Sequence, residues 1–582
     1  MQEQTAVAQA SARRTVTGDD MKKTIPTIII IILIAILGFA FWKFTFRKMS
    51  YSGKWTDLET YYGIQDEDDF PVIHQDELSD MHARRFDGAY YMKLEDVAAH
   101  MTKRFYFGKA DGKVYYCLPD DRIVLVPGET AWTTDGGQKG QEEAAPAVLD
   151  GETLWLSLDF VKNYANFSYS AFTEPNRLVL TTAWEEETVA EVKDSTMVRI
   201  TGGIKSEIAG EAESGTTVRI LEPMDTWSGI MTEDGVFGYV ENDTLGEPYT
   251  RQPEPVETYT EPDYKTRSLD KKINMVWHNV AVVEGNDTIG GLFANVKGVN
   301  ILSPTWFYVS DENGDVKNII YKENIDLMHG RGIQVWALFD NFSSGQSYTD
   351  FLTTDAGRST AISQVVAACE EYGIDGINVD IENITPERGG DFIEFIRELC
   401  IAAHKKNLYV SVDNYVPYNF NDYYHLDEQG KFADYIVLMG YDEHYAGSQE
   451  AGSVASIDYV TYGIGEALKE VPKDKLINAI PFYTRIWTTS PEGVSSQAVT
   501  MAYCQEFMQQ HGMKPEWSDS FGQYYAEARE GDNYYQIWVE GKKSIELKLR
   551  VMEEYGLAGV AEWCLGFETP EIWDVIEAYM KQ

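Results

Sequence analysis

The sequence predicts a multidomain chain of 582 residues whose C-terminal part is an α/β TIM (β/α)8 barrel with an insertion. We expect a transmembrane helix, a small α+β repeat domain and a small all-β barrel before it. Three observations support this class. Segments with strand composition alternate with amphipathic helical patterns in the C-terminal half. Polar residues stand where several of those segments end. The length exceeds what one core supports, since single cores rarely grow beyond about 250–300 residues.

The barrel prediction rests on eight candidate strands over roughly 300 residues, which is the size typical of this fold. The interval 484–557 separates the last two strands and must hold the insertion, with antiparallel strands expected around 499–503 and 534–539. The candidate strands are 273–277, 298–306, 333–340, 376–382, 408–414, 435–442, 476–483 and 559–566.

The strand 376–382 is the centre of the prediction. Asn378, Asp380 and Glu382 occupy alternate positions, with aliphatic residues between them. This spacing puts the three polar side chains on one face of a strand. Helical patterns on both sides indicate burial of both faces, although a half-exposed edge strand is the alternative. Because unpaired burial of a carboxylate is costly, these residues need partners or a function, and we interpret them as an active site.

Other strand ends point to the same place. Tyr441 and Asp442 end one candidate strand, and Trp563 lies near the end of the last. Chemistry in such barrels lies at the C-terminal ends of the strands. The sequence therefore predicts that these residues meet Glu382 in one site.

Three motifs occur in order along the C-terminal half: Asp375-Gly376-x-Asn378-x-Asp380-x-Glu382, Met439-Gly440-Tyr441-Asp442 and Trp563. They resemble the DGxDxDxE signature, the Met-x-Tyr-Asp motif and the strand-eight tryptophan of glycoside hydrolase family 18, the chitinase-like enzymes. The resemblance covers about residues 271–582.

One position departs from the signature, because Asn378 replaces its middle aspartate. That replacement resembles the spore-germination and cortex-lytic subgroup, which acts on peptidoglycan. The stretch 480–487 is similar to the subgroup's PFYGRxW motif, with Thr484 in place of its glycine.

The resemblance implies a retaining mechanism in which the substrate's own 2-acetamido group attacks the anomeric carbon. Glu382 is then the general acid and later the base, with a pKa raised by enclosure and by Asp380. Asp380 would hold the acetamido nitrogen, and Tyr441 the acetamido oxygen. Asn378 would orient Asp380 without adding a charge, so that Asp380 stays ionised more readily.

The remaining site residues are implied substrate contacts. Asp442 would position the sugar or the water, and Trp563 would form the apolar floor under the sugar ring. Trp336 or Trp306 would extend the groove, while Tyr483 and Arg485 belong to the subgroup motif. From its position on the opposite face of the strand, Asp375 is expected to have a structural role, and Gly376 to allow tight packing.

The net charge of −44 makes nucleic acid an unsuitable partner, because phosphates require a basic footprint. Residues 25–42 are almost wholly apolar, and with Phe44 and Phe46, beyond Lys43, they approach the ~20 residues that cross a bilayer, so we expect a transmembrane helix at 25–46. A cleaved signal peptide is the alternative. The basic residues that flank this segment are similar in number before and after it, so they barely decide its orientation. The bulk of the chain follows the segment, and residues 86–248 resemble domains suited to a cell wall. We therefore expect a single-pass bacterial membrane protein with its N-terminus inside and its catalytic domain outside.

The regions around these parts have distinct compositions. Residues 1–24 are expected to be a cytoplasmic tail, 47–85 an acidic irregular tether, and 249–268 a linker into the barrel at 269–582. Residues 86–187 resemble the repeat related to the N-terminal domain of copper amine oxidases, with hairpins expected at 113–126 and 167–181. Residues 188–248 resemble a bacterial Src-homology-3-like domain.

No cofactor or metal site is predicted, because the histidines and cysteines do not cluster. Cys369 and Cys400 lie on helical apolar faces and are expected in the core.

Together these features predict a membrane-anchored glycosidase that cleaves after N-acetylglucosamine in peptidoglycan or spore cortex. The alternatives are a chitinase and a non-catalytic glycan-binding wall protein. The oligomeric state is left open.

Overall fold

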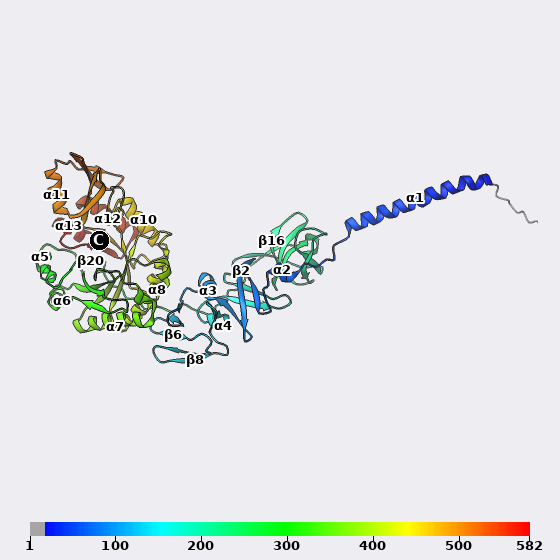
Figure 1. Cartoon of the computed structure of the whole chain (residues 1–582), viewed down its shortest axis with the longest axis horizontal. Coiled ribbons are helices and arrows are strands. Elements are labelled where there is room, and N and C mark those ends of the chain that lie inside the picture. The colour runs from blue at the N-terminus through cyan, green and yellow to red at the C-terminus, as the bar shows by residue number, and fades with distance from the viewer. Residues whose placement is uncertain (1–17, 582) are drawn as a thin grey trace, which may run out of the picture. The chain divides into compact units, whose positions relative to one another are not determined.

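A computed structural model describes residues 18–581, so part of the predicted tail at 1–24 lies outside the described residues. The chain forms two compact units (Figure 1). Within the described range, the first unit comprises 18–91 and 166–258, and the second comprises 92–165 and 259–581.

The first unit begins with α1 (Gly18–Met49). Its part Pro26–Met49 contains an 18-residue stretch with a mean hydropathy of 2.5, none of which is buried within the structure. Length and composition therefore allow this helix to cross a membrane, or to act as a signal sequence.

The region expected as an irregular tether contains ordered structure, so the prediction for 47–85 was wrong in part. It holds α2 (Leu58–Tyr62), β1 (Asp69–His74) and most of β2 (Glu77–Phe86). Strand β1 is buried through Phe70, Val72 and Ile73 and pairs in parallel with β12 (Arg177–Thr181), about a hundred residues later. The strand was missed for two reasons. The residues around β1 are acidic, and its partner strand β12 lies far along the sequence.

The first unit also contains two sheets. One places β11 (Ser168–Phe172), β12, β1 and β2 side by side, and β11–β12 is the hairpin expected at 167–181. The other is a seven-stranded sheet in the order β15-β14-β18-β17-β16-β13-β19, around a core that includes Val198, Val218, Ile230 and Val240. Its strands are β13 (Glu187–Glu191), β14 (Thr196–Arg199), β15 (Ile208–Ala212), β16 (Thr217–Pro223), β17 (Trp227–Thr232), β18 (Phe237–Glu241) and β19 (Tyr249–Arg251).

Residues 92–165 of the second unit form a small antiparallel sheet and a hairpin. The sheet runs in the order β4-β5-β6-β7-β8, and its β5–β6 pair is the hairpin expected at 113–126. The elements are α3 (Leu94–His100), β4 (Phe105–Gly108), β5 (Lys113–Cys117), β6 (Arg122–Leu125), β7 (Ala131–Thr134), β8 (Lys139–Gln141), β9 (Ala147–Asp150), β10 (Thr153–Ser157) and α4 (Leu158–Val161), after β3 (Ala89–Lys93).

The rest of the second unit is the predicted barrel of eight parallel strands. Their order is β20-β33-β27-β26-β25-β24-β23-β21, and β20 pairs with β21 to close the ring. The strands are β20 (Ile273–His278), β21 (Ile301–Val309), β23 (Gln334–Asp340), β24 (Gly376–Asp380), β25 (Tyr409–Tyr415), β26 (Tyr435–Met439), β27 (Leu476–Pro481) and β33 (Gly559–Trp563).

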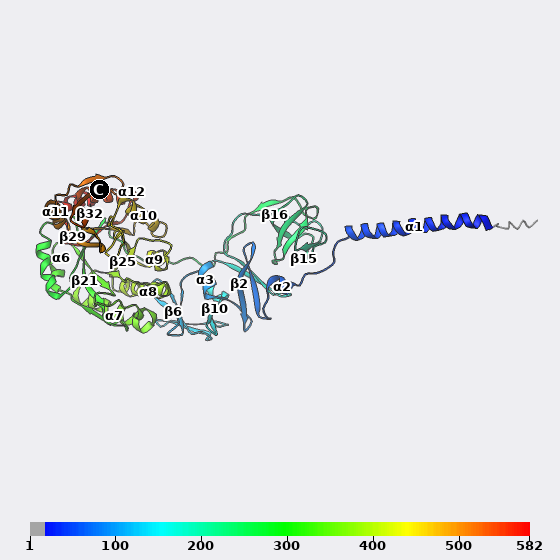
Figure 2. The same cartoon turned by 45° about the horizontal axis from the view of Figure 1, so that its top comes forward.

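Helices surround these strands (Figures 1 and 2). Helix α7 shows why they begin and end where they do. The side chain of Thr354 accepts a hydrogen bond from Gly357 N at its start, and Gly373 ends it with a left-handed φ of 76°. The helices are α5 (Ile289–Leu292), α6 (Lys322–His329), α7 (Asp355–Tyr372), α8 (Gly389–Lys405), α9 (Leu426–Phe432), α10 (Ile457–Ala467), α12 (Lys542–Tyr555) and α13 (Ile572–Met580).

The insertion after β27 is an antiparallel sheet with one helix. Its strands β28 (Tyr483–Ser490), β29 (Gly493–Thr500), β31 (Gln523–Glu530) and β32 (Asn533–Val539) include the segment expected near 534–539, and β30 (Glu516–Ser518) lies at the edge. The strand expected around 499–503 is instead the junction of β29 with α11 (Met501–Gln510). Thr500 ends the strand there because its hydroxyl accepts from Tyr503 N and starts the helix.

Candidate active site

A cavity of about 840 Å³ lies at the C-terminal ends of the barrel strands. Carboxylates and aromatic rings line it. The predicted site residues Asp380, Glu382, Tyr441, Asp442, Tyr483 and Trp563 all contribute to its wall. The structure thus brings together six of the side chains that the sequence assigned to the site.

Strand β24 holds the centre of the site, and all its residues are buried, as predicted. Ile377 and Val379 pack into the core between strands and helices. Asn378 lies on the opposite face, inside the barrel. Gly376 allows close packing at the start of the strand, since a Cβ there would lie 2.8 Å from the Trp336 ring.

Asp375 has the structural role predicted for it. Its Oδ2 accepts hydrogen bonds from the Val335 backbone N–H at 2.8 Å and, at the end of α6, from His329 Nε2 at 2.7 Å.

Asn378 does not orient Asp380, contrary to the prediction. Its Nδ2 donates to Ser411 Oγ at 3.0 Å and to Asp413 Oδ1 at 2.7 Å. Its Oδ1 accepts from Trp277 Nε1 at 2.7 Å and Ser303 Oγ at 3.0 Å. Asn378 therefore joins β20, β21, β24 and β25 beneath the cavity and lies outside the cavity wall.

Asp380 is 7% exposed, and its buried Oδ1 has no hydrogen-bond partner within residues 18–581. Burial raises its pKa well above the ordinary value, and the carboxyls of Asp413, Glu382 and Asp340 raise it further. Burial and the three neighbouring carboxyls thus disfavour the ionised form of Asp380, contrary to the expectation that it ionises readily.

Glu382 follows β24 and is fixed through its backbone. Its N–H donates to Asn341 Oδ1 at 2.9 Å, and its C=O accepts from Asn341 Nδ2 at 3.0 Å. Burial raises the pKa of the Glu382 carboxyl, as predicted, and a hydrogen bond from Tyr415 opposes this rise. The carboxyls of Asp442 and Asp340 add to it, and the repulsion between Glu382 and Asp380 disfavours ionisation of both as a pair.

Asp442 follows β26 with a left-handed φ of 59°, which is uncommon for a residue other than glycine. Its Oδ1 accepts from the Tyr483 hydroxyl at 2.5 Å and lies 3.7 Å from Arg485 Nη2. Tyr441 packs edge-on against Tyr483, with ring centroids 6.2 Å apart. These contacts hold the segment that follows β26 against the segment that follows β27, at the wall of the cavity.

Trp563 ends β33 and contributes to the cavity wall. Its ring lies 5.7 Å from that of Trp277, the donor to Asn378. The cavity therefore combines a flat apolar surface with two acids, the buried Asp380 and the half-buried Glu382, which suits the binding and protonation of a sugar.

The protein-family model described as "Glycosyl hydrolases family 18" matches residues 287–568. Residues 287–568 are a family 18 glycosyl hydrolase domain. The match covers most of the barrel and includes the strands that carry Asp380, Glu382, Tyr441 and Trp563.

The chain is also similar to curated proteins and to a solved structure. The chain is 23% identical to "Uncharacterized glycosylase YvbX" of Bacillus subtilis over 282 residues, which are 46% of this chain and 81% of that protein. It is 24% identical to the "Cortical fragment-lytic enzyme" of Bacillus subtilis over 38% of this chain, and spans about half (53%) of that enzyme. The crystal structure of the Bacillus cereus spore cortex-lytic enzyme SleL is similar at 17% identity, with a TM-score of 0.48, over 56% of this chain and 77% of that one.

Two tryptophans predicted to line the groove of the family 18 domain do not do so. Trp336 lies near the start of β23, fully buried, and stacks on Tyr409 with centroids 5.1 Å apart. Trp306 is buried in the core outside the barrel ring and donates to Asn286. Both predictions failed because a tryptophan near a strand end can face either end or either side of the barrel.

Arg485 of the family 18 domain stands behind the cavity wall. It contacts Asp442 and donates to Ser496 Oγ at 3.3 Å. Thr484, which replaces the motif's glycine, is fully buried, and its hydroxyl accepts from Glu540 N at 3.0 Å in the insertion. The substitution thus adds a contact within the insertion, between β28 and the residue that follows β32.

Sequence reasoning missed several residues of the family 18 site. Asp413 alternates with Ser411 along β25, so the spacing that revealed Asp380 would also have revealed it. Tyr415, two positions further on, continues the same alternation at the end of β25. The cavity's aromatic side includes Tyr418, which stacks on Phe420 with centroids 5.3 Å apart and lies in a loop without a strand pattern.

Proposed function

We propose that this protein hydrolyses the β-1,4 bond after N-acetylglucosamine in peptidoglycan or spore cortex, with retention of configuration and participation of the substrate. One observation carries the proposal. Asp380 and Glu382, two acids with raised pKa values, border one cavity together with Tyr441 and Trp563.

In the first step the acetamido carbonyl oxygen of the bound sugar attacks its own anomeric carbon. The bond to the leaving oxygen breaks, and that oxygen takes the proton of Glu382. A raised pKa suits this role, because the acid must be protonated near neutral pH. In the second step the Glu382 carboxylate takes a proton from water, whose oxygen attacks the anomeric carbon and opens the oxazolinium ring.

Asp380 and Tyr441 serve the acetamido group. The partnerless Oδ1 of Asp380 is suited to accept the acetamido N–H, and its charge would stabilise the oxazolinium. The Tyr441 hydroxyl would donate to the acetamido oxygen. Asp442, held by Tyr483, would position the sugar or the attacking water, with the Trp563 ring beneath it.

The proposed setting is a bacterial cell surface. Helix α1 would anchor the chain, with the catalytic domain outside the membrane. The repeat related to copper amine oxidases at 86–187 and the Src-homology-3-like domain at 188–248 remain proposed identities for the regions before the barrel. Their wall-type character, together with relatives named for cortex lysis, favours a wall glycan over chitin.

The test incubates the full chain and its Glu382→Gln variant with purified sacculi, spore cortex and chitin. We expect the wild type to release reducing ends from a wall glycan and the variant to release none. Release from chitin alone would support a chitinase instead. Binding to these glycans without release would support the glycan-binding alternative.

A further inference from the structure

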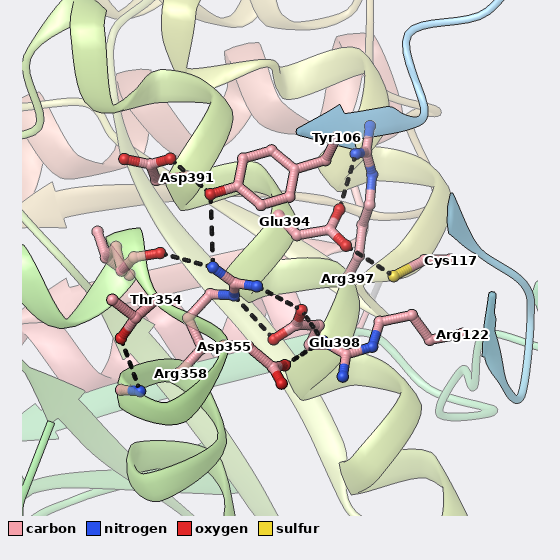
Figure 3. A network of polar contacts seen from close by, with 12 residues as sticks. Tyr106, Cys117, Arg122, Thr354, Asp355, Arg358, Asp391, Glu394, Arg397 and Glu398 are labelled. Carbon is pink, nitrogen blue, oxygen red and sulfur yellow. Dashed lines mark hydrogen bonds and ion pairs between the residues drawn. The ribbon is translucent and has the colours of Figure 1, made fainter. Parts of the chain in front are cut away.

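One face of the small sheet β4–β8 packs on helices α7 and α8 of the barrel, within the second unit. Figure 3 shows the polar contacts that join them. Tyr106 from β4 and Arg122 from β6 reach the same two helices. The Tyr106 hydroxyl donates to Asp391 Oδ1 at 2.7 Å, in the first turn of α8.

The centre of this contact is Arg358 of α7, which is fully buried. Its Nε and Nη2 donate to the two oxygens of Glu398 at 2.9 and 3.0 Å. Arg122 also binds Glu398 and lies 2.7 Å from Asp355. Removing one partner of such a buried charge set is strongly destabilising, so the contact is a permanent part of the unit.

A chain of contacts leads from Arg358 to the proposed catalytic residue, Glu382. Arg358 Nη1 donates to Leu352 O at 2.8 Å and to the Tyr106 hydroxyl at 3.4 Å. Leu352 belongs to the 3-10 helix η3 (Asp350–Thr353), which ends the segment joining β23 to α7. This segment starts at Asn341, the residue that holds the Glu382 backbone.

A second route joins the same parts. Asp391, the acceptor of Tyr106, is 3.3 Å from Arg388 Nη1, and Arg388 Nη2 donates to Asp350 of η3 at 2.7 Å. Asn341 Nδ2 also donates to Tyr348 O at 3.1 Å, which closes the segment on itself. The sheet β4–β8 is thus linked to the segment 341–353 by two routes, one through Arg358 and one through Asp391 and Arg388, and none of its residues lines the cavity.

We propose that residues 92–165 are a fixed part of the catalytic unit, and that Tyr106 and Arg122 are positioning residues that hold segment 341–353 and, through Asn341, the backbone of Glu382. The proposal rests on the catalytic role given to Glu382 above. It assigns this region a brace function, which differs from a spacer or a wall-binding module.

Two tyrosines on neighbouring strands offer a matched test in the full chain. Tyr115 stacks on Tyr106 with centroids 6.1 Å apart, but its buried hydroxyl has no hydrogen-bond partner among the described residues. Tyr106→Phe therefore removes hydrogen bonds that Tyr115→Phe leaves intact. We expect Tyr106→Phe to lower kcat about three- to tenfold with KM unchanged, in line with the loss of a buried hydrogen bond, and Tyr115→Phe to change neither.

Hydrogen exchange separates this proposal from the proposed function. The backbone amides of 341–353 should exchange faster in Tyr106→Phe than in the wild type. In Tyr115→Phe their exchange rates should equal those of the wild type. Arg122→Lys, which keeps the charge, should lie between wild type and Tyr106→Phe in both readouts. Equal exchange and equal kcat in the two tyrosine variants would overturn the brace, as would faster exchange with kcat unchanged. If the wild type hydrolyses no glycan, the proposed function fails, while exchange still tests the contact.

Discussion

Asn378 donates its side-chain amide to Asp413 Oδ1 at 2.7 Å and makes no hydrogen bond to its strand neighbour Asp380. The position at which this chain departs from the family signature is therefore occupied by a neutral group that satisfies a buried carboxyl. Burial raises the pKa of Asp413, and the hydrogen bond from Asn378 opposes that rise. With the neutral Asn378 in place of the signature's aspartate, the barrel interior has no third carboxyl at this position beside those of Asp380 and Asp413.

Asn378→Asp replaces the donor with a third carboxyl beside Asp380 and Asp413. Like charges raise each other's pKa, so ionisation of Asp380 should require a higher pH. Because the mechanism needs ionised Asp380, we expect the acidic limb of the pH–rate profile to move to higher pH. Superimposable profiles of kcat/KM for the variant and the wild type would contradict this.

Tyr415→Phe removes the hydrogen bond that lowers the pKa of Glu382. The pKa of Glu382 should therefore rise. Because Glu382 acts while protonated, the alkaline limb of kcat/KM should move to higher pH. Tyr423→Phe, which removes a hydroxyl from the same cavity wall, is the control and should leave the limb in place. An equal shift in both variants would argue against a specific Tyr415 contact.

Trp336→Ala should affect stability without changing substrate affinity. The side chain is fully buried near the start of β23, and its loss should lower the free energy of unfolding by about 3–5 kcal/mol. In the fraction that remains folded, KM should equal that of the wild type. Trp563→Ala should instead raise KM or lower kcat. Denaturation and steady-state kinetics of both variants distinguish a role in core packing from a role in substrate binding. A raised KM in Trp336→Ala would show that Trp336 contributes to substrate binding after all.

Lys548→Met tests the buried ion pair that joins the insertion to α12. Lys548 Nζ lies 2.8 Å from Glu540 Oε1, and both side chains are almost fully buried. Removing the cation leaves a buried carboxylate without its partner, so stability should fall by about 3–5 kcal/mol. Lys542→Met, on the exposed side of the same helix, should change stability by less than about 0.5 kcal/mol. Equal denaturation midpoints would show that the pair contributes little.

Most of the barrel could be predicted from the sequence, because strand and helix periods differ and the eight strands follow one another in space. Asp380 and Glu382 were predictable for the same reason, since alternation puts them on one face. The predicted partner of Asn378 was wrong because hydrogen bonds within a barrel run between neighbouring strands. Ser411 and Asp413 on β25 reach it, while Asp380 on its own strand does not.

Other features depend on tertiary packing that no local pattern contains. Strand β1 lies in a region with an acidic composition and gains its identity from β12, far along the chain. Trp336 and Trp306 have the same residue type as Trp563, yet only the direction of each side chain in the closed barrel decides which one meets the cavity. The contacts of Arg122 and Tyr106 with Glu398 and Arg358 join the sheet β4–β8 to two barrel helices, although the sequence predicts separate domains for the sheet and the barrel.

The most direct test of the central claim compares leaving groups in wild type and Glu382→Gln. If Glu382 protonates the leaving oxygen, the variant should lose at least about a hundredfold in kcat/KM on an N-acetylglucosamine oligosaccharide, whose leaving sugar needs a proton. It should lose far less on the matching 2,4-dinitrophenyl glycoside, whose leaving group departs without one. Equal losses on the two substrates, or no loss on either, would contradict the role of Glu382 as the general acid.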